Sequence, residues 1–388
     1  MPQLLDRLHA LKRDLKLLWT AVFCMMYGFG IYSAIFYNFA TETLSIQPNQ
    51  LGPVEAVREF PGILCFLLAA LTMRVAEPML GSIMLFAMSG GMAAYAWVHG
   101  IPSLMAFSFV WSVGFHAWMP LQSSLVLRFS GEGNNKGKRL GQTMCVGSLG
   151  SVLGMLTVRL IGNTIIYPHW FLFGSGMIFL AAVVMLGLRR EINHADRPRF
   201  VWKRKYGLYY WLTLLEGGRK QVFMTFAVYA LTREYHTSLK TVALLMVINN
   251  IVNMVGGPYV GRLIDRIGER KILMSSYSAL ILVFIGYAKI PNAHILYVLY
   301  CLDNFFYLST TCLTTYLQKI AEPEDLTPAL STGVTANHVM AVVVPLIGGQ
   351  LWASLGYQVT FLGGAVVVVV SLFLASRLRT NKKVLDTV

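Results

Sequence analysis

The chain has 388 residues, of which 56% are hydrophobic and only 13% are charged, about half the charged share of an ordinary globular domain. Its 32 Lys and Arg against 18 Asp and Glu give a net charge of +14. So few charges cannot cover a soluble fold of this length, and so many apolar residues exclude disorder. The composition predicts an integral membrane protein.

Twelve apolar segments follow one another along the chain, each long enough to cross a bilayer as a helix. Residues 79–127 contain no Asp, Glu, Lys or Arg, and Gly100-Ile101-Pro102 divides them into two spans. The predicted spans are 17–41, 51–74, 79–99, 102–128, 140–163, 167–188, 207–232, 240–262, 272–290, 293–319, 330–352 and 356–377. We therefore expect an all-α integral membrane protein with twelve transmembrane helices in two pseudo-symmetric six-helix bundles.

Basic residues predict the orientation. With the N-terminus inside, 25 of the 32 Lys and Arg fall on the cytoplasmic side and three on the outer side, as the positive-inside rule requires. We expect a multi-pass protein of the cell (inner) membrane with both termini cytoplasmic. The +14 balance is then a mark of orientation and gives no support to nucleic-acid binding. Residues 1–16 are either a helix lying along the inner membrane surface or a helical run-in to the first span.

The longest polar stretch divides the chain in two. We expect a cytoplasmic N-terminal segment, a first bundle, a linker, a second bundle and a tail, over residues 1–16, 17–188, 189–206, 207–377 and 378–388. A shift of 192 residues places Trp19 on Trp211 and Glu42 on Glu234. Repeated matches at one offset indicate a six-span duplication, which transporters often show.

One loop motif is specific. Between the eighth and ninth predicted spans the chain reads Gly261-Arg262-Leu263-Ile264-Asp265-Arg266-Ile267-Gly268-Glu269-Arg270-Lys271. It resembles the cytoplasmic loop signature of the major facilitator superfamily, with Glu269 where that family usually has Arg. The resemblance extends over essentially the whole chain, and it implies a cytoplasmic gate formed by Gly261, Asp265, Arg266, Gly268 and Arg270. The alternative is that these basic residues only anchor the loop inside.

The corresponding loop of the first half departs from the pattern, because Met73 stands where Asp is expected and Ala76 where Gly is expected. The latch is therefore expected on one side only. In the fifth predicted span, Gly147, Gly150 and Gly154 favour close helix packing, but the Gly-Pro of the drug–proton antiporter signature is absent.

Charges at bilayer depth are costly and are candidates for function. The resemblance implies a cavity lined by the first, fourth, seventh and tenth spans. The candidates for substrate binding or proton coupling are Glu216, Arg219, Asp303, His116, Glu59 and Asn250. The alternatives are charge pairing alone for the seventh-span and tenth-span groups, interfacial pairing or an outer gate for Glu59, and simple packing for His116.

These features favour a secondary active transporter of a small solute that works by alternating access, with proton coupling as a hypothesis. One alternative is a non-transporting receptor or partner subunit with a transporter-like body, and another is a multidrug or amphiphile exporter. No enzyme is expected, because the chain has neither H-E-x-x-H nor a Walker sequence. The five cysteines have no disulfide or zinc spacing, so we expect no metal or cofactor. The expected partners are a small molecule, protons and the lipid bilayer, with the chain a monomer.

Overall fold

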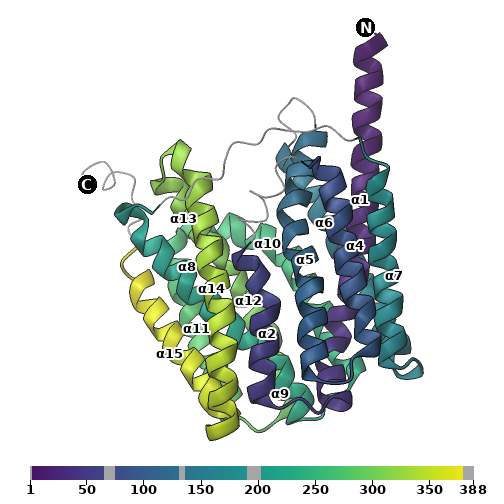
Figure 1. Cartoon of the computed structure of the whole chain (residues 1–388). Coiled ribbons are helices and arrows are strands. Elements are labelled where there is room, and N and C mark those ends of the chain that lie inside the picture. The colour runs from purple at the N-terminus through teal and green to yellow at the C-terminus, as the bar shows by residue number, and fades with distance from the viewer. Residues whose placement is uncertain (1, 65–74, 131–135, 190–201, 379–388) are drawn as a thin grey trace. The chain divides into compact units, whose positions relative to one another are not determined.

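The computed structural model describes residues 2–64, 75–130, 136–189 and 202–378, and every regular element in these ranges is a helix (Figure 1). Each of the twelve predicted segments overlaps helical residues, although the second one, 51–74, continues beyond the described part of the chain at residue 65. Within the described residues, nine helices are long and apolar enough to cross a membrane.

Three predicted spans are not among those nine, and two of them are interrupted helices. The segment predicted at 207–232 is α8 (Gly207–Gln221), a π-helical stretch η5 (Val222–Ala227) and α9 (Val228–Arg233). The segment predicted at 293–319 is α12 (Ala293–Tyr307), a 3₁₀ stretch η6 (Leu308–Thr310) and α13 (Thr311–Ile320). Irregular turns inside a helix often mark functional positions.

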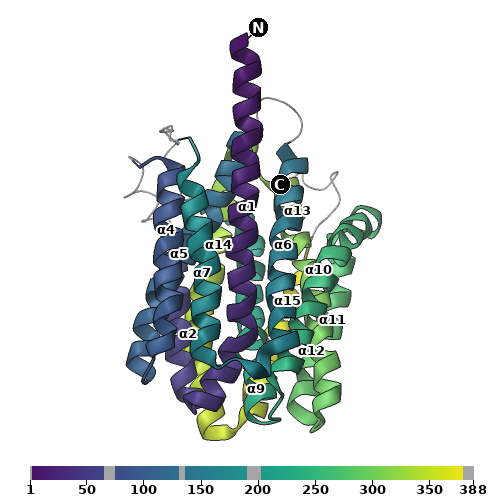
Figure 2. The ribbon, with the colours of Figure 1, turned by 90° about the vertical axis from the view of Figure 1, so that its right-hand side faces the viewer.

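The first of two packing units comprises Met1–Leu44, Leu64–Arg197 and Ser238–Asn250. Its helical elements are α1 (Pro2–Asn38), η1 (Phe39–Thr43), α4 (Glu77–Ala94), η2 (Tyr95–Trp97), α5 (Ile101–Phe129), α6 (Lys136–Ile161), η3 (Gly162–Thr164) and α7 (Tyr167–Leu186). Figure 2 shows α1 flanked by α6 and α7. Helix α4 packs against α5 and α7.

Glycines permit the close approach of α1 and α6. A Cβ atom on Gly154 would lie 2.2 Å from the carbonyl oxygen of Tyr27, and one on Gly150 would lie 2.5 Å from that of Phe23. The predicted close packing of the fifth span is thus confirmed at these two glycines. Gly147 meets only side chains, at 3.4 Å and beyond, which is ordinary van der Waals distance.

Helix α1 is continuous from Pro2, so the segment before the first span is a helical run-in (Figure 2). This outcome favours the second of the two alternatives for residues 1–16.

The second packing unit comprises Ser45–Ile63, Pro198–Thr237 and Ile251–Val388. Besides the two interrupted spans it contains α2 (Pro48–Ile63), η4 (Arg204–Tyr206), α11 (Glu269–Lys289), α14 (Pro323–Leu355) and α15 (Tyr357–Ala375), and α10 (Leu239–Ile267) belongs partly to each unit. Helix α14 packs against α2 and α8 (Figure 1). Each unit thus takes one segment from the other half of the sequence, whereas the predicted bundles follow chain order and stay a prediction.

Glycines also permit the contact of α2 with α14. A Cβ on Gly52 would lie 2.3 Å from the carbonyl oxygen of Pro345, and one on Gly349 would lie 2.4 Å from that of Pro48. Both distances are far inside van der Waals contact. The backbones therefore touch, and any larger side chain would force the helices apart.

The described end of the 189–206 linker is tied to the start of α14. Lys203 Nζ lies 2.5 Å from Asp325 Oδ2, Lys205 Nζ lies 2.5 Å from Glu322 Oε1, and the Tyr206 hydroxyl donates to Asp325 Oδ2 at 2.7 Å. The hydrogen bonds from Lys205 and Lys203 lower the pKa of Glu322. In return, the bonds to Asp325 and Glu322 raise the pKa of Lys203.

Two turns share an unusual backbone. Among the described residues, the non-glycine residues with positive φ are Ser45 and His236, both at 48°. They are 191 residues apart, one short of the 192-residue offset of the sequence repeat, and each lies where the chain passes from one packing unit to the other. The same local geometry therefore recurs after the first and the seventh predicted spans.

The turn that follows Ser45 is held by α9. The carbonyl oxygen of Ile46 accepts hydrogen bonds from the Tyr229 hydroxyl at 2.5 Å and from Arg233 Nη1 at 2.7 Å. Arg233 Nη2 also donates to Gln47 Oε1 at 2.6 Å. We call these contacts the Ile46 clasp.

Candidate functional site

The largest buried charge cluster of the described residues centres on Arg219, whose side chain is fully buried. Its Nε donates to Glu216 Oε1 at 3.0 Å and its Nη1 to Asp303 Oδ1 at 2.7 Å, while Nη2 also contacts Glu216 Oε1. Glu216 lies one turn earlier on α8, and Asp303 comes from α12. The structure therefore brings together three of the residues predicted from the sequence, which we call the triad.

The triad has one cation for two carboxylates. A buried charge is tolerated only when it is paired and hydrogen-bonded, and one guanidinium balances only one carboxylate. Glu216 Oε2 is buried, and the buried Tyr277 hydroxyl lies beside Glu216. The triad therefore has the capacity to take up one proton or one further positive charge.

Tyr307 extends this cluster and was missed by the sequence analysis. Arg219 Cζ lies 5.5 Å and Lys220 Nζ 5.8 Å from the centre of its ring, within the range of cation–π attraction. Helix α12 gives way to η6 immediately after Tyr307, and α8 gives way to η5 one residue after Lys220. The Gly217-Gly218 pair before Arg219 was the available sequence signal for an irregular helix.

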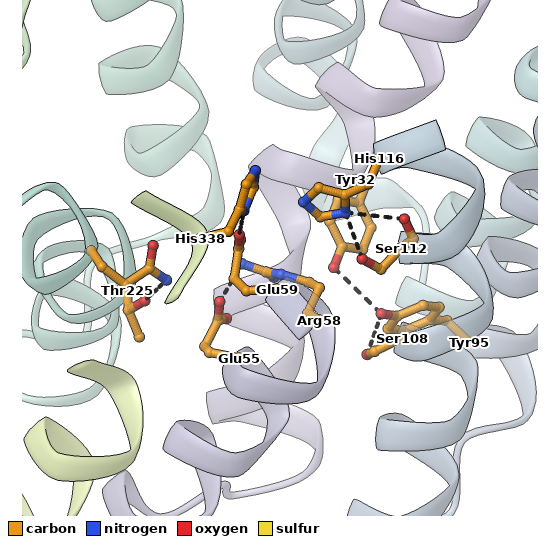
Figure 3. A network of polar contacts seen from close by, with 11 residues as sticks. Tyr32, Glu55, Arg58, Glu59, Tyr95, Ser108, Ser112, His116, Thr225 and His338 are labelled. Atoms are coloured by element: carbon orange, nitrogen blue, oxygen red, sulfur yellow. Dashed lines mark hydrogen bonds and ion pairs between the residues drawn. The ribbon is translucent and has the colours of Figure 1, made fainter. Parts of the chain in front are cut away.

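Glu59 makes a separate contact with α14. Its Oε2 lies 3.3 Å from His338 Nδ1, while Arg58 pairs with Glu55 on the same helix (Figure 3). Glu55 and Arg58 thus pair at i, i+3 spacing on one face of α2. Glu59, a predicted site residue, instead contacts the histidine of α14.

His116 lies in the first packing unit and contacts its own helix. Its Nδ1 lies 2.9 Å from Ser112 Oγ and 3.1 Å from the Ser112 carbonyl oxygen (Figure 3). A neighbouring chain of hydroxyl groups joins Tyr95 to Ser108 at 2.6 Å and to Tyr32 at 3.4 Å. These hydrogen bonds of the first unit are therefore made by hydroxyl groups and an imidazole.

Asn250 was predicted as a site residue, and its Nδ2 lies 3.5 Å from Met155 Sδ of α6. Its Nδ2 donates to the Met246 carbonyl oxygen of the same helix at 3.0 Å. One turn later, Asn253 and Asn304 exchange amide hydrogen bonds at 3.1 and 3.4 Å between α10 and α12. The amide–amide contact between helices thus belongs to Asn253.

The loop motif turns at Gly268, and its predicted gate residues lie around this turn. Gly268 has φ of 81° and caps the N-terminus of α11, a conformation that glycine adopts without strain. Asp265, Arg266 and Arg270 are exposed, and within the described ranges they form no ion pair. No atom beyond its own helix lies within 4 Å of a Cβ built on Gly261.

The buried charge of the loop motif is Glu269, the position that departs from the family pattern. Glu269 is fully buried at the first turn of α11, and Lys319 Nζ lies 2.5 Å from its Oε1. The helix N-terminus adds a favourable electrostatic contribution to a carboxylate there. The loop thus holds α11 to α13 through an ion pair that the gate prediction did not include.

The second half of the chain matches a known protein family, and the whole fold is similar to solved transporter structures. Residues 209–386 match the family model of the Major Facilitator Superfamily. The fold is similar to that of a mutant nucleoside transporter NupG, with a TM-score of 0.78 and 16% identity over 94% of this chain and 98% of that one. It is also similar to a POT family transporter in complex with 5-aminolevulinic acid, with a TM-score of 0.74 and 13% identity over 93% and 95% of the two chains.

A third similar structure is a bacterial homologue of the human lysosomal transporter Spinster, with a TM-score of 0.65 and 14% identity over 96% of this chain and 97% of that one. No curated protein sequence matches the chain. The second half of the chain, residues 209–386, thus matches the major facilitator superfamily, which the loop motif at 261–271 resembles. The apolar helices and this match support a multi-pass membrane protein.

Proposed function

We propose that the protein is a secondary active transporter that moves a small solute by alternating access and couples this movement to protons at the triad. The observation that carries the proposal is the fully buried Arg219 bound to carboxylates from two helices, α8 and α12. Both helices become irregular directly beyond this cluster. Broken helices next to a polar site are typical of transporter substrate sites.

The charge balance of the second packing unit supports proton coupling. Its described membrane-embedded carboxylates are Glu55, Glu59, Glu216 and Asp303, and its permanent cations are Arg58, Arg219 and Lys220. Neutrality therefore needs one proton, on His338 or on a carboxylate. Because an unbalanced charge at bilayer depth is costly, loss of that proton favours a change in the surroundings of the cluster.

The rest of the proposal concerns topology. Both termini are cytoplasmic in the cell (inner) membrane, and the two six-helix bundles 17–188 and 207–377 rock about the central site. The loop at 261–271 then lies on the cytoplasmic side and contributes to the inner gate. The predominance of Lys and Arg in the predicted cytoplasmic segments supports this orientation.

Reconstitution into liposomes tests the proposal. With a pH gradient imposed, addition of a transported solute should change the internal pH of vesicles that contain the wild-type protein. Asp303→Asn and Glu216→Gln should abolish this proton movement, because each removes a carboxylate that shares Arg219. Glu42→Gln, the same chemical change at the Tyr167 contact of the first unit, is the matched control and should behave as wild type.

Two results would overturn the proposal. If both triad variants retained wild-type proton movement, the triad would have no coupling role. If no solute from a broad panel of metabolites and amphiphiles moved into or out of the vesicles, the alternative of a receptor with a transporter-like body would stand.

A further inference from the structure

Four aromatic rings of the first packing unit lie nearly parallel. The ring planes of Phe29, Trp111 and Phe115 differ by 8–13°, with centroids 5.1–6.1 Å apart. Tyr32 continues the row at 4.5 Å and 24° from Trp111. Offset stacking of this kind orients the π-faces alike. We call these four residues, from α1 and α5, the aromatic stack.

The two α5 residues of the stack are more buried than the neighbouring Phe109 and Val110. Phe109 and Val110 are exposed, at 39% and 44%, whereas Trp111 is 3% exposed and Phe115 is half-buried. At about 100° per residue, Phe115 lies about 120° from Phe109 and about 140° from Val110 around the helix axis. The ring of Phe115 is therefore partly accessible at a different angle from these two side chains.

Polar groups border the stack on the same helix. The His116 ring stands at 90° to that of Phe115 with centroids 5.3 Å apart, and it contacts Ser112. The Trp111 Nε1 donor is buried and has no hydrogen-bond partner among the described residues. A flat π-surface next to an imidazole, a hydroxyl and an unused N–H donor suits a planar ring with polar atoms at its edge.

We infer that the aromatic stack is a binding subsite for a planar heteroaromatic ring of the transported solute, with Phe115 as the stacking residue and His116 and Trp111 at the polar edge. The inference rests on the proposed transport function and adds the substrate class to it. It selects a nucleobase-sized, uncharged heterocycle over an aliphatic or sugar-like solute, because only a flat ring gains from parallel stacking.

A matched pair of probes tests the inference on the purified full chain in detergent. Uracil and 5,6-dihydrouracil carry the same polar groups, but only uracil is planar and aromatic, and adenine serves as a larger planar probe. Binding is followed by quenching of tryptophan fluorescence, taken as the difference between wild type and Trp111→Phe. Uracil or adenine should quench this signal at concentrations about tenfold lower than dihydrouracil.

Variants on α5 separate stacking from general packing. Phe115→Ala should weaken binding of the planar probe about tenfold and leave binding of dihydrouracil unchanged. Phe115→Tyr keeps the ring and should restore the preference. Phe109→Ala, the same change at an exposed position of α5 outside the stack, is the control and should bind as wild type. Size-exclusion profiles establish that each variant is folded.

The outcomes distinguish this inference from the proposed function. It is overturned if neither planar probe quenches Trp111, if dihydrouracil binds as tightly as uracil, or if Phe115→Ala behaves like Phe109→Ala. Liposomes that transport a non-planar solute, together with the absence of planar-probe binding, would refute the subsite and leave the transporter intact. Planar-probe binding without solute flux or proton movement would support the subsite and refute transport.

Discussion

The two packing units bury their polar side chains in different ways. In the second unit, Arg219 is fully buried between two carboxylates. In the first unit, buried polar contacts join hydroxyl groups and an imidazole, namely Tyr95 with Ser108 and Ser112 with His116. An ion triad loses much more than a neutral hydrogen bond when one member is removed. We therefore expect the loss of a triad member to cost more stability than the loss of one of these hydroxyl groups.

The strongest challenge to this comparison is Arg219→Met. Loss of the guanidinium leaves Glu216 and Asp303 buried without their cation, so we expect a loss of about 3–5 kcal/mol of folding stability. Thermal unfolding in detergent measures it. The triple variant that adds Glu216→Gln and Asp303→Asn should recover most of the loss, because no charge then remains unpaired. A single variant that melts like wild type would contradict the assignment of a buried ion triad.

Both units have glycines at close helix contacts, and replacing these glycines should give the next largest loss of stability. Gly154→Ala in the first unit and Gly52→Ala in the second each place a methyl group against a carbonyl oxygen at 2.2 and 2.3 Å. We expect each to cost about 1–3 kcal/mol from overpacking. Gly176→Ala on α7, with nothing within 4 Å, is the control. Equal melting temperatures for all three variants would show that the helix contacts are looser than described.

Lys319→Met examines a partly exposed charge pair of the second unit. Glu269 stays buried without its ammonium partner, but the α11 N-terminus still stabilises its carboxylate. We therefore expect a smaller loss, about 1–2 kcal/mol, read from the shift of the urea unfolding midpoint. Lys271→Met, at an exposed position of the same loop, should leave the midpoint unchanged. A loss as large as that of Arg219→Met would remove the distinction between the two ion pairs.

Ser108→Ala is the counterpart in the first unit. It removes the 2.6 Å hydrogen bond to the Tyr95 hydroxyl, which still lies 3.4 Å from that of Tyr32. We expect a loss of about 1 kcal/mol. Ser123→Ala, at an exposed position of α5, controls for the loss of a serine hydroxyl on this helix. A loss of 3 kcal/mol or more, on the order expected for the triad, would erase the contrast between the units.

The smallest effect concerns the linker and depends on pH. The pKa of Glu322 is lowered from its ordinary value of 4.5. Its ion pairs therefore stabilise the folded linker fully above pH 4.5, and this stabilisation is lost as the pH falls through the folded-state pKa. The pKa of Lys203 is raised from its ordinary value of 10.5. Its ion pairs therefore stabilise the folded linker fully below pH 10.5, and this stabilisation is lost as the pH rises through the folded-state pKa. The tie between linker and α14 should therefore hold from about pH 5 to pH 10.

Proteolysis at neutral to mildly basic pH measures this tie. Glu322→Gln should increase trypsin cleavage after Lys203 and Lys205, because both ammonium groups lose a partner. Glu324→Gln, an exposed neighbour on the first turn of α14, should leave the cleavage rate unchanged. Equal rates for both variants would refute the role of Glu322.

The sequence predicted the helical segments and part of the site, for identifiable reasons. The length of an apolar segment identifies a span regardless of which helices pack against it. Each predicted segment therefore overlaps a helix. Glu216 and Arg219 could be paired because i, i+3 spacing places them on one face of a helix. Asp303 was predicted to lie near them because the family resemblance implied that the seventh and tenth spans line one cavity.

The remaining features depend on contacts between segments distant in sequence. Nothing in the sequence near Asn250 showed that its amide would bond to its own helix while Asn253 reaches α12. The pairing of Glu269 with Lys319 spans 50 residues, and no spacing rule covers that range. Glu59 with His338 is a similar case, since the partner depends on which face of α14 packs against α2.

The Ile46 clasp has a consequence for how the turn between α1 and α2 can open. One carbonyl oxygen accepts from two donors, and one guanidinium also reaches Gln47. A left-handed serine persists only where surrounding contacts hold it. Withdrawal of Arg233 would break two of these bonds together and leave Ser45 strained without support. The turn therefore opens cooperatively, and its rate of opening should rise steeply with temperature.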